Sequence, residues 1–118
     1  MDYRELTVWQ KAMDLVEEVY TLTKAFPQSE QYGLTNQLRR AAVSIPSNIA
    51  EGNSRNSLQE YARFLSIARG SKSEVETQLE IGVRLNYISP DQTKHALELS
   101  AEIGKMLNKL IKKLIPNP

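Results

Sequence analysis

The chain has 118 residues, with 15 Lys and Arg against 14 Asp and Glu, a formal net charge of +1, and no cysteine. This length favours one domain over residues 1–118. The small net charge gives no global attraction to polyanions, and the lack of cysteine excludes disulfides and thiolate chemistry. No signal-peptide pattern and no run of about 18 apolar residues is present, which predicts a cytoplasmic protein.

The first predicted helix spans residues 6–26. Its apolar side chains recur every three or four positions from Trp9 to Tyr20, which is the spacing of an amphipathic helix. Phe26 precedes Pro27, and the residue before a proline disfavours the helical region. We therefore expect the helix to end there.

The second predicted helix carries an apolar stripe from Leu34 to Ile49. Thr35 is the preferred N-cap, and Ser29 is the alternative. Gly52 is expected to end the helix as a left-handed residue just past its C-terminus.

Pro46 lies inside this second helix. It lacks an amide donor and crowds the carbonyl of Ala42, which costs about 3 kcal/mol in a helix interior. The apolar phase nevertheless continues from Ala42 to Ile49. The sequence thus predicts a continuous helix that is kinked at Pro46.

Capping signals mark the last two helices. Ser57 followed by Glu60 is a capping box that opens a third helix, expected to end near Asn86. Ser89 begins a serine cap with a proline in the first turn and a glutamine at the third position, and this fourth helix ends before Pro116. Short loops between four long helices predict an all-α, up-down-up-down antiparallel four-helix bundle.

The sequence offers little for catalysis. His95 is the one histidine, so zinc-type sites lack ligands. The segment Arg69–Ser73, "RGSKS", lacks the phosphate-loop pattern and falls within a predicted helix. Gly70 and Ser71 instead predict a close approach of another helix. We expect no enzyme activity, no catalytic residue, no cofactor and no metal.

Basic residues fall into two groups. One lies near the end of the fourth helix, where positive charge complements the helix dipole, and consists of Lys105, Lys109, Lys112 and Lys113. The other is spread over the middle two helices and favours phosphate binding, because arginine is the usual choice for that group. From it we predict a nucleic-acid-binding surface that includes Arg39, Arg63, Arg69 and Lys72.

A polar stripe on the second helix and two apolar residues beside the main stripe of the third helix predict self-association. A wide apolar arc is seldom left exposed on a monomer, and short polar residues let another surface come close. The predicted interface residues are Arg40, Ser44, Asn48, Glu51, Phe64 and Ile67. The alternative for Asn48 and Glu51 is that they only cap the loop before Ser57.

Four segments carry a resemblance to a known family: "LTVWQKAMDLVEEVY", "YGLTNQLRRAAVSIPSNIAEG", "YARFLSIARGSKSEVETQL" and "LNYIS". From about Tyr3 to Ser89 the chain resembles the four-helix bundle proteins encoded within 23S rRNA intervening sequences. These are similar to the accessory variability proteins of diversity-generating retroelements. The resemblance implies a homopentamer associated with nucleic acid and no enzyme activity.

The expected function is therefore a homo-oligomeric scaffold that engages RNA, DNA or a nucleoprotein, and the alternative is an oligomeric protein–protein adaptor without nucleic-acid binding. Neither a membrane nor a small-molecule substrate is expected as a partner.

Overall fold

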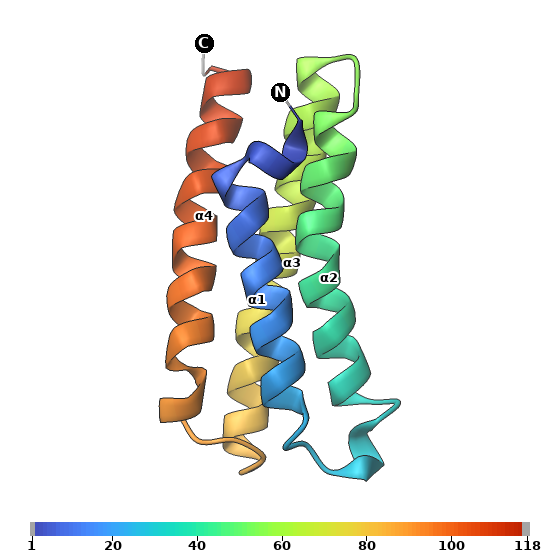
Figure 1. Ribbon diagram of the computed structural model, residues 1–118, viewed down its shortest axis with the longest axis vertical. Coiled ribbons are helices and arrows are strands. Elements are labelled where there is room, and N and C mark those ends of the chain that lie inside the picture. The colour runs from blue at the N-terminus through green and yellow to red at the C-terminus, as the bar shows by residue number, and fades with distance from the viewer. Residues whose placement is uncertain (1, 117–118) are drawn as a thin grey trace.

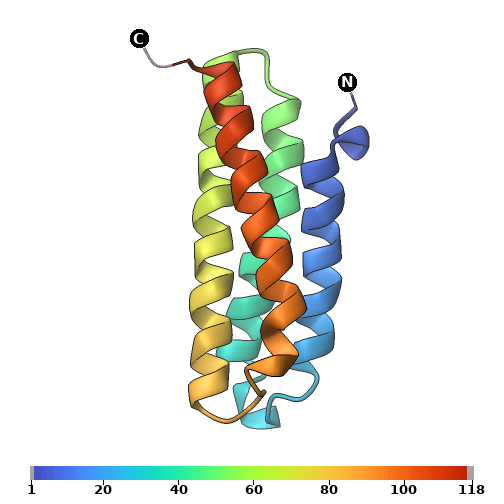
Figure 2. The same cartoon turned by 90° about the vertical axis from the view of Figure 1, so that its left-hand side faces the viewer.

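The computed structural model describes residues 2–116, and over this range it contains four α-helices, three short 3-10 turns and no strand. The α-helices are α1 (Thr7–Thr23), α2 (Leu34–Asn53), α3 (Leu58–Arg84) and α4 (Lys94–Leu114). They run alternately up and down a bundle of 45 × 24 × 23 Å (Figure 1, Figure 2). Each helix packs on the next in sequence, and α4 also packs on α1. The predicted antiparallel four-helix bundle is confirmed.

The apolar stripes of the four helices meet in one core. Fully burying such a side chain contributes about 1.5–3 kcal/mol. The largest completely buried apolar side chains are Leu15, Leu38, Ile45, Ile49, Leu65, Leu79, Ile103 and Leu107. The most extensive helix pair in this core is α2 with α3.

The start of α2 differs from the sequence prediction. Glu30, in the 3-10 turn before α2, accepts a hydrogen bond from the Leu34 amide at 3.0 Å and another from the Tyr87 hydroxyl at 2.8 Å. The Leu34 amide, followed by the Tyr87 hydroxyl, lowers the pKa of the Glu30 carboxyl. Neither Thr35 nor Ser29 is the cap: Thr35 is buried within the helix, and Ser29 lies in the preceding turn. A carboxylate reaching across the turn has satisfied the free amide instead.

The end of α2 also differs. Gly52 is a buried helical residue that lacks a positive φ, and the helix continues to Asn53. A Cβ at Gly52 would lie 2.9 Å from the Phe64 Cβ and 3.1 Å from the Tyr61 carbonyl oxygen. The prediction of a left-handed C-terminal glycine was therefore wrong, and the glycine is needed for the close approach of α3.

Helix α2 is continuous across Pro46, as predicted. Two side chains on the next turn bond to main-chain carbonyls near the proline. The Ser47 hydroxyl donates to the Val43 carbonyl at 2.8 Å, and the Asn48 amide donates to the Ser44 carbonyl at 2.8 Å. The kink itself stays a prediction.

Both predicted serine caps are present, but among the described residues the Glu60 side chain does not complete the capping box, because its carboxylate bonds to Arg63 instead. The Ser57 hydroxyl accepts from the Glu60 amide at 3.0 Å. At the other cap, the Ser89 hydroxyl accepts from the Gln92 amide at 3.2 Å, and the Gln92 side chain accepts from the Ser89 amide at 2.8 Å. A 3-10 turn, Asp91–Thr93, separates this second cap from the first residue of α4.

Candidate nucleic-acid interface

The four basic residues predicted to bind nucleic acid do not form one patch. Arg39 lies near the start of α2, beside the end of α1, whereas Arg63 and Arg69 lie in the first half of α3. Lys72 lies further along α3 and faces α4. Each therefore has to be judged by its own surroundings.

Lys72 ties α3 to α4. Its Nζ lies 2.8 Å from the Glu76 carboxylate, which also accepts a hydrogen bond from Ser100 on α4 at 2.5 Å. The side chain is 15% exposed, and its stem crosses Gly104, where a Cβ would lie 2.6 Å from the Lys72 Cε. Burial raises the pKa of Glu76, but hydrogen bonds from Lys72 and Ser100 outweigh it, and the net pKa is lowered. The positive charge of Lys72 is therefore paired with a carboxylate inside the bundle.

Arg63 is engaged by its own helix. Its guanidinium bonds to both oxygens of Glu60, at 3.0 and 3.4 Å, and lies 4.7 Å from the centre of the Phe64 ring. The hydrogen bond from Arg63 lowers the pKa of Glu60. Arg55 covers the same ring at 4.9 Å and pairs with Glu51 at 3.4 Å. Local carboxylates therefore neutralise much of the charge at the α2–α3 turn.

Arg69 differs, because its partner is neutral. Its Nη1 donates to the side-chain oxygen of Asn108 on α4 at 2.8 Å. Helices α3 and α4 together form a groove of about 470 Å³ that no carboxylate lines. Its lining residues, called here the basic groove, are Arg69, Asn108, Lys109, Ile111 and Lys112. Among residues 2–116, none of its three cationic side chains forms an ion pair.

In the sequence, Arg69 and the α4 lysines fall into separate groups of basic residues. Antiparallel packing of α3 on α4 brings the first half of α3 beside the last turns of α4 (Figure 2). A usable signal was present in the sequence, because no acidic residue follows Glu102 while four lysines do. Helix-dipole complementarity explains lysines at a C-terminus, but it does not explain a carboxylate-free groove shared with Arg69.

The residues predicted as an interface divide into inward-facing and outward-facing ones. Ser44 shares a 2.8 Å hydrogen bond with Ser71 of α3, and Asn48 donates to the Ser44 hydroxyl at 2.9 Å from within α2, so Ser44 serves the α2–α3 contact and Asn48 holds its hydroxyl. Glu51 pairs with Arg55 in the following turn, which fits the loop-capping alternative. Facing outward are Arg40 and Ile67, the latter 40% exposed, while Phe64 is half-buried.

An apolar groove that the sequence analysis missed runs between α1 and α2. Tyr3 and Trp9 meet there edge to face, with ring centres 5.3 Å apart. The groove holds about 300 Å³ and is lined by Tyr3, Trp9, Met13, Val16, Val43, Pro46, Ser47 and Ala50.

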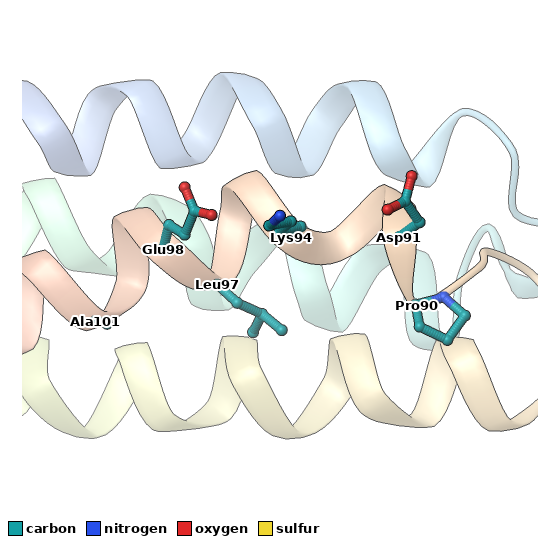
Figure 3. Close-up of a pocket in the computed structure, with 6 residues that line it drawn as sticks. All are labelled: Pro90, Asp91, Lys94, Leu97, Glu98 and Ala101. Atoms are coloured by element: carbon teal, nitrogen blue, oxygen red, sulfur yellow. The ribbon is translucent and has the colours of Figure 1, made fainter.

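A hollow of about 680 Å³ beside the start of α4 is lined by both charged and apolar side chains (Figure 3). Asp91 and Glu98 point toward the α1 side of the helix, and Leu97 points toward α3. The other lining residues are Pro90, Lys94 and Ala101. Two carboxylates against one ammonium do not favour a polyanion here.

Comparison with known proteins places the chain in a family. The family model described as "23S rRNA-intervening sequence protein" matches residues 4–109. The chain belongs to this family. The match reaches further than the resemblance seen in the sequence, because it includes most of α4.

A solved structure supports the same assignment. The crystal structure of a protein with unknown function from the S23 ribosomal protein family of Bacteroides thetaiotaomicron is similar, with a TM-score of 0.82 and 28% sequence identity. The similarity covers 90% of this chain and 99% of that one. No curated protein matches the chain. Within residues 2–116, no helix has the length and apolar character needed to cross a membrane.

Proposed function

We propose that this member of the 23S rRNA-intervening sequence protein family is a non-enzymatic homo-oligomeric scaffold that binds nucleic acid through the basic groove. The observation that carries the proposal is a groove with three cationic side chains and no carboxylate. In the rest of the described chain, six of the basic side chains are paired with nearby carboxylates.

The groove suits the phosphate backbone better than the bases. Asn108 holds the Arg69 guanidinium in place, and a planar guanidinium matches two phosphate oxygens at once. Lys109 and Lys112 add mobile point charges. No aromatic side chain lines the groove, so bases have no surface on which to stack. We therefore expect binding with little dependence on nucleotide sequence.

Self-association is the second part of the proposal. Three cations on one subunit bind a polyanion weakly, whereas several grooves on one particle bind it together. The apolar groove between α1 and α2 and the exposed Ile67 support an oligomer, because monomers seldom expose large apolar patches. The expectation of five subunits rests on the family resemblance.

Salt dependence tests the nucleic-acid part. Fluorescence anisotropy would follow binding of a labelled RNA hairpin and a labelled DNA duplex between about 50 and 200 mM salt, where counterion release makes affinity fall steeply. Lys109→Gln and Lys112→Gln should each reduce the slope of log affinity against log salt by about one. Lys94→Gln is the matched control, since this exposed lysine lies at the other end of α4.

Three results would contradict all or part of the proposal. Equal slopes for wild type, both groove variants and the control would show that the groove does not contact phosphate. An oligomer by light scattering that binds neither probe at the lowest salt would instead support the adaptor alternative. A monomeric mass at micromolar concentration would remove the oligomeric part.

A further inference from the structure

A second cationic site lies at the end of the bundle opposite the basic groove, where α1 ends and α2 begins (Figure 1). It is a cleft of about 520 Å³ between these two helices, and no carboxylate lines it. The lining residues, called here the arginine cleft, are Tyr20, Asn36, Arg39, Arg40, Val43 and Ser44.

Arg39 is fixed in this cleft by neutral contacts. Its Nε donates to the Thr23 hydroxyl at 2.8 Å, and Thr23 is 3% exposed. That hydroxyl in turn donates to the Val19 carbonyl at 2.8 Å, so its direction is set. The guanidinium also lies 4.5 Å from the centre of the Tyr20 ring. These contacts hold the plane of the guanidinium while leaving both of its Nη groups without a protein partner among residues 2–116.

Neither arginine of the cleft forms an ion pair within the described chain, although Arg40 also borders a neighbouring hollow that Glu74 lines. Within residues 2–116, neither Arg39 nor Arg40 has a carboxylate within 4.0 Å, although Arg4, Arg55, Arg63 and Arg84 all do. Two adjacent arginines, one of them rigid, thus face solvent in a hollow. A fixed pair of Nη donors is the geometry that binds two oxygens of one anion, because little side-chain entropy is lost on binding.

We propose that the arginine cleft binds the phosphomonoester of a nucleotide, either free or at the end of a nucleic-acid strand. A phosphomonoester carries nearly two negative charges near neutral pH and three acceptor oxygens, which matches two guanidinium groups. A backbone phosphodiester carries one charge and matches them less well. Tyr20, 40% exposed, and the Asn36 amide at the same cleft offer a ring face and hydrogen bonds to a base.

The binding test compares AMP, inorganic phosphate and adenosine by calorimetric titration of the full chain. AMP should bind and adenosine should not. Arg40→Gln should weaken AMP binding at least about tenfold, as expected for loss of a hydrogen bond to a charged group. The Arg40 side chain has no protein partner among the described residues, so the Arg40→Gln variant should fold normally. Arg39→Lys keeps the charge but loses the planar donor pair and should weaken binding by a similar factor.

Short oligonucleotides distinguish the two sources of the phosphate. If the source is a strand end, a 5′-phosphorylated oligonucleotide binds wild type at least about tenfold more tightly than its 5′-hydroxyl form. If the source is a free nucleotide, AMP binds while the two oligonucleotides remain equal. Both results support the cleft.

Four results overturn the proposal. AMP and phosphate could bind no better than adenosine, or Arg40→Gln could leave AMP affinity unchanged. A phosphoserine peptide that binds more tightly than AMP would exclude a nucleotide as the ligand. Lys109→Gln serves as the control: loss of AMP binding in this variant alone would assign the phosphate to the basic groove, so the two proposed sites can fail independently.

Discussion

Replacing Gly52 with alanine tests how closely α2 and α3 are packed. The new Cβ would lie 2.9 Å from the Phe64 Cβ, 3.0 Å from the Tyr61 Cδ1 and 3.1 Å from the Tyr61 carbonyl oxygen. Two of these atoms belong to or adjoin the main chain of α3, so relief requires the helices to separate. Such overpacking costs about 2–3 kcal/mol, while alanine regains about 1 kcal/mol of helix propensity. We expect a net loss of about 1–2 kcal/mol of unfolding free energy.

Gly70→Ala is the matched control. Gly70 is helical like Gly52, but it is exposed, and a Cβ there would meet no other described atom within 4 Å. This variant should therefore gain about 1 kcal/mol, from helix propensity alone. Urea unfolding followed by circular dichroism, at one protein concentration for all variants, measures both effects. A Gly52→Ala protein as stable as Gly70→Ala would refute the assigned contact.

Four further variants test the polar contacts between helices. Glu76→Gln should destabilise the protein by about 1–3 kcal/mol at neutral pH, because it removes the negative charge opposite the largely buried Lys72 ammonium and leaves only a weaker amide acceptor. The folded-state pKa of Glu76 lies below its ordinary 4.5, so its stabilisation is complete above that pH and is lost as the pH falls through the folded-state value. Urea titrations from pH 7 to about 3 should thus show a smaller acid-induced loss for Glu76→Gln, and equal losses would contradict this. Ser44→Ala and Ser71→Ala should each cost about 1–2 kcal/mol, whereas the double variant should cost less than their sum, because no hydroxyl is then left unpaired. Strict additivity in the double-mutant cycle would show that the two hydroxyls do not interact.

Most of the fold could be predicted from the sequence because the signals were local. The apolar spacing and the Ser57 and Ser89 caps depend on residues within one turn of each other. The start of α2 was missed because its cap, Glu30, lies outside the helix and is itself bonded to Tyr87, 57 positions away. Gly52 was misread for a similar reason: its role depends on α3, which its local sequence does not show.

The candidate site was less predictable, because a charge is useful only where no partner neutralises it. Lys72 and Arg63 looked as available as Arg69 in the sequence. In the structure Lys72 is paired with Glu76 and Arg63 with Glu60, whereas Arg69 has no carboxylate partner in residues 2–116 and lies beside the α4 lysines. The Ser71 prediction of a close helix contact was correct, since it meets α2 at Ser44, but Gly70 next to it faces open space.

A net charge of +1 hides a division along the bundle axis. No carboxylate follows Glu102 in α4, so the end that carries the basic groove is cationic there, whereas Asp91, in the turn before α4, and Glu98, near the start of α4, lie at the other end. In the proposed oligomer, cyclic symmetry with parallel long axes would place every basic groove on one face and every acidic α4 start on the other. A long polyanion would then be attracted to one face and repelled by these carboxylates on the other. The arginine cleft, at the acidic end, would be reached by a small or terminal phosphate rather than by a continuous strand. Near-neutral composition is therefore compatible with oriented nucleic-acid binding.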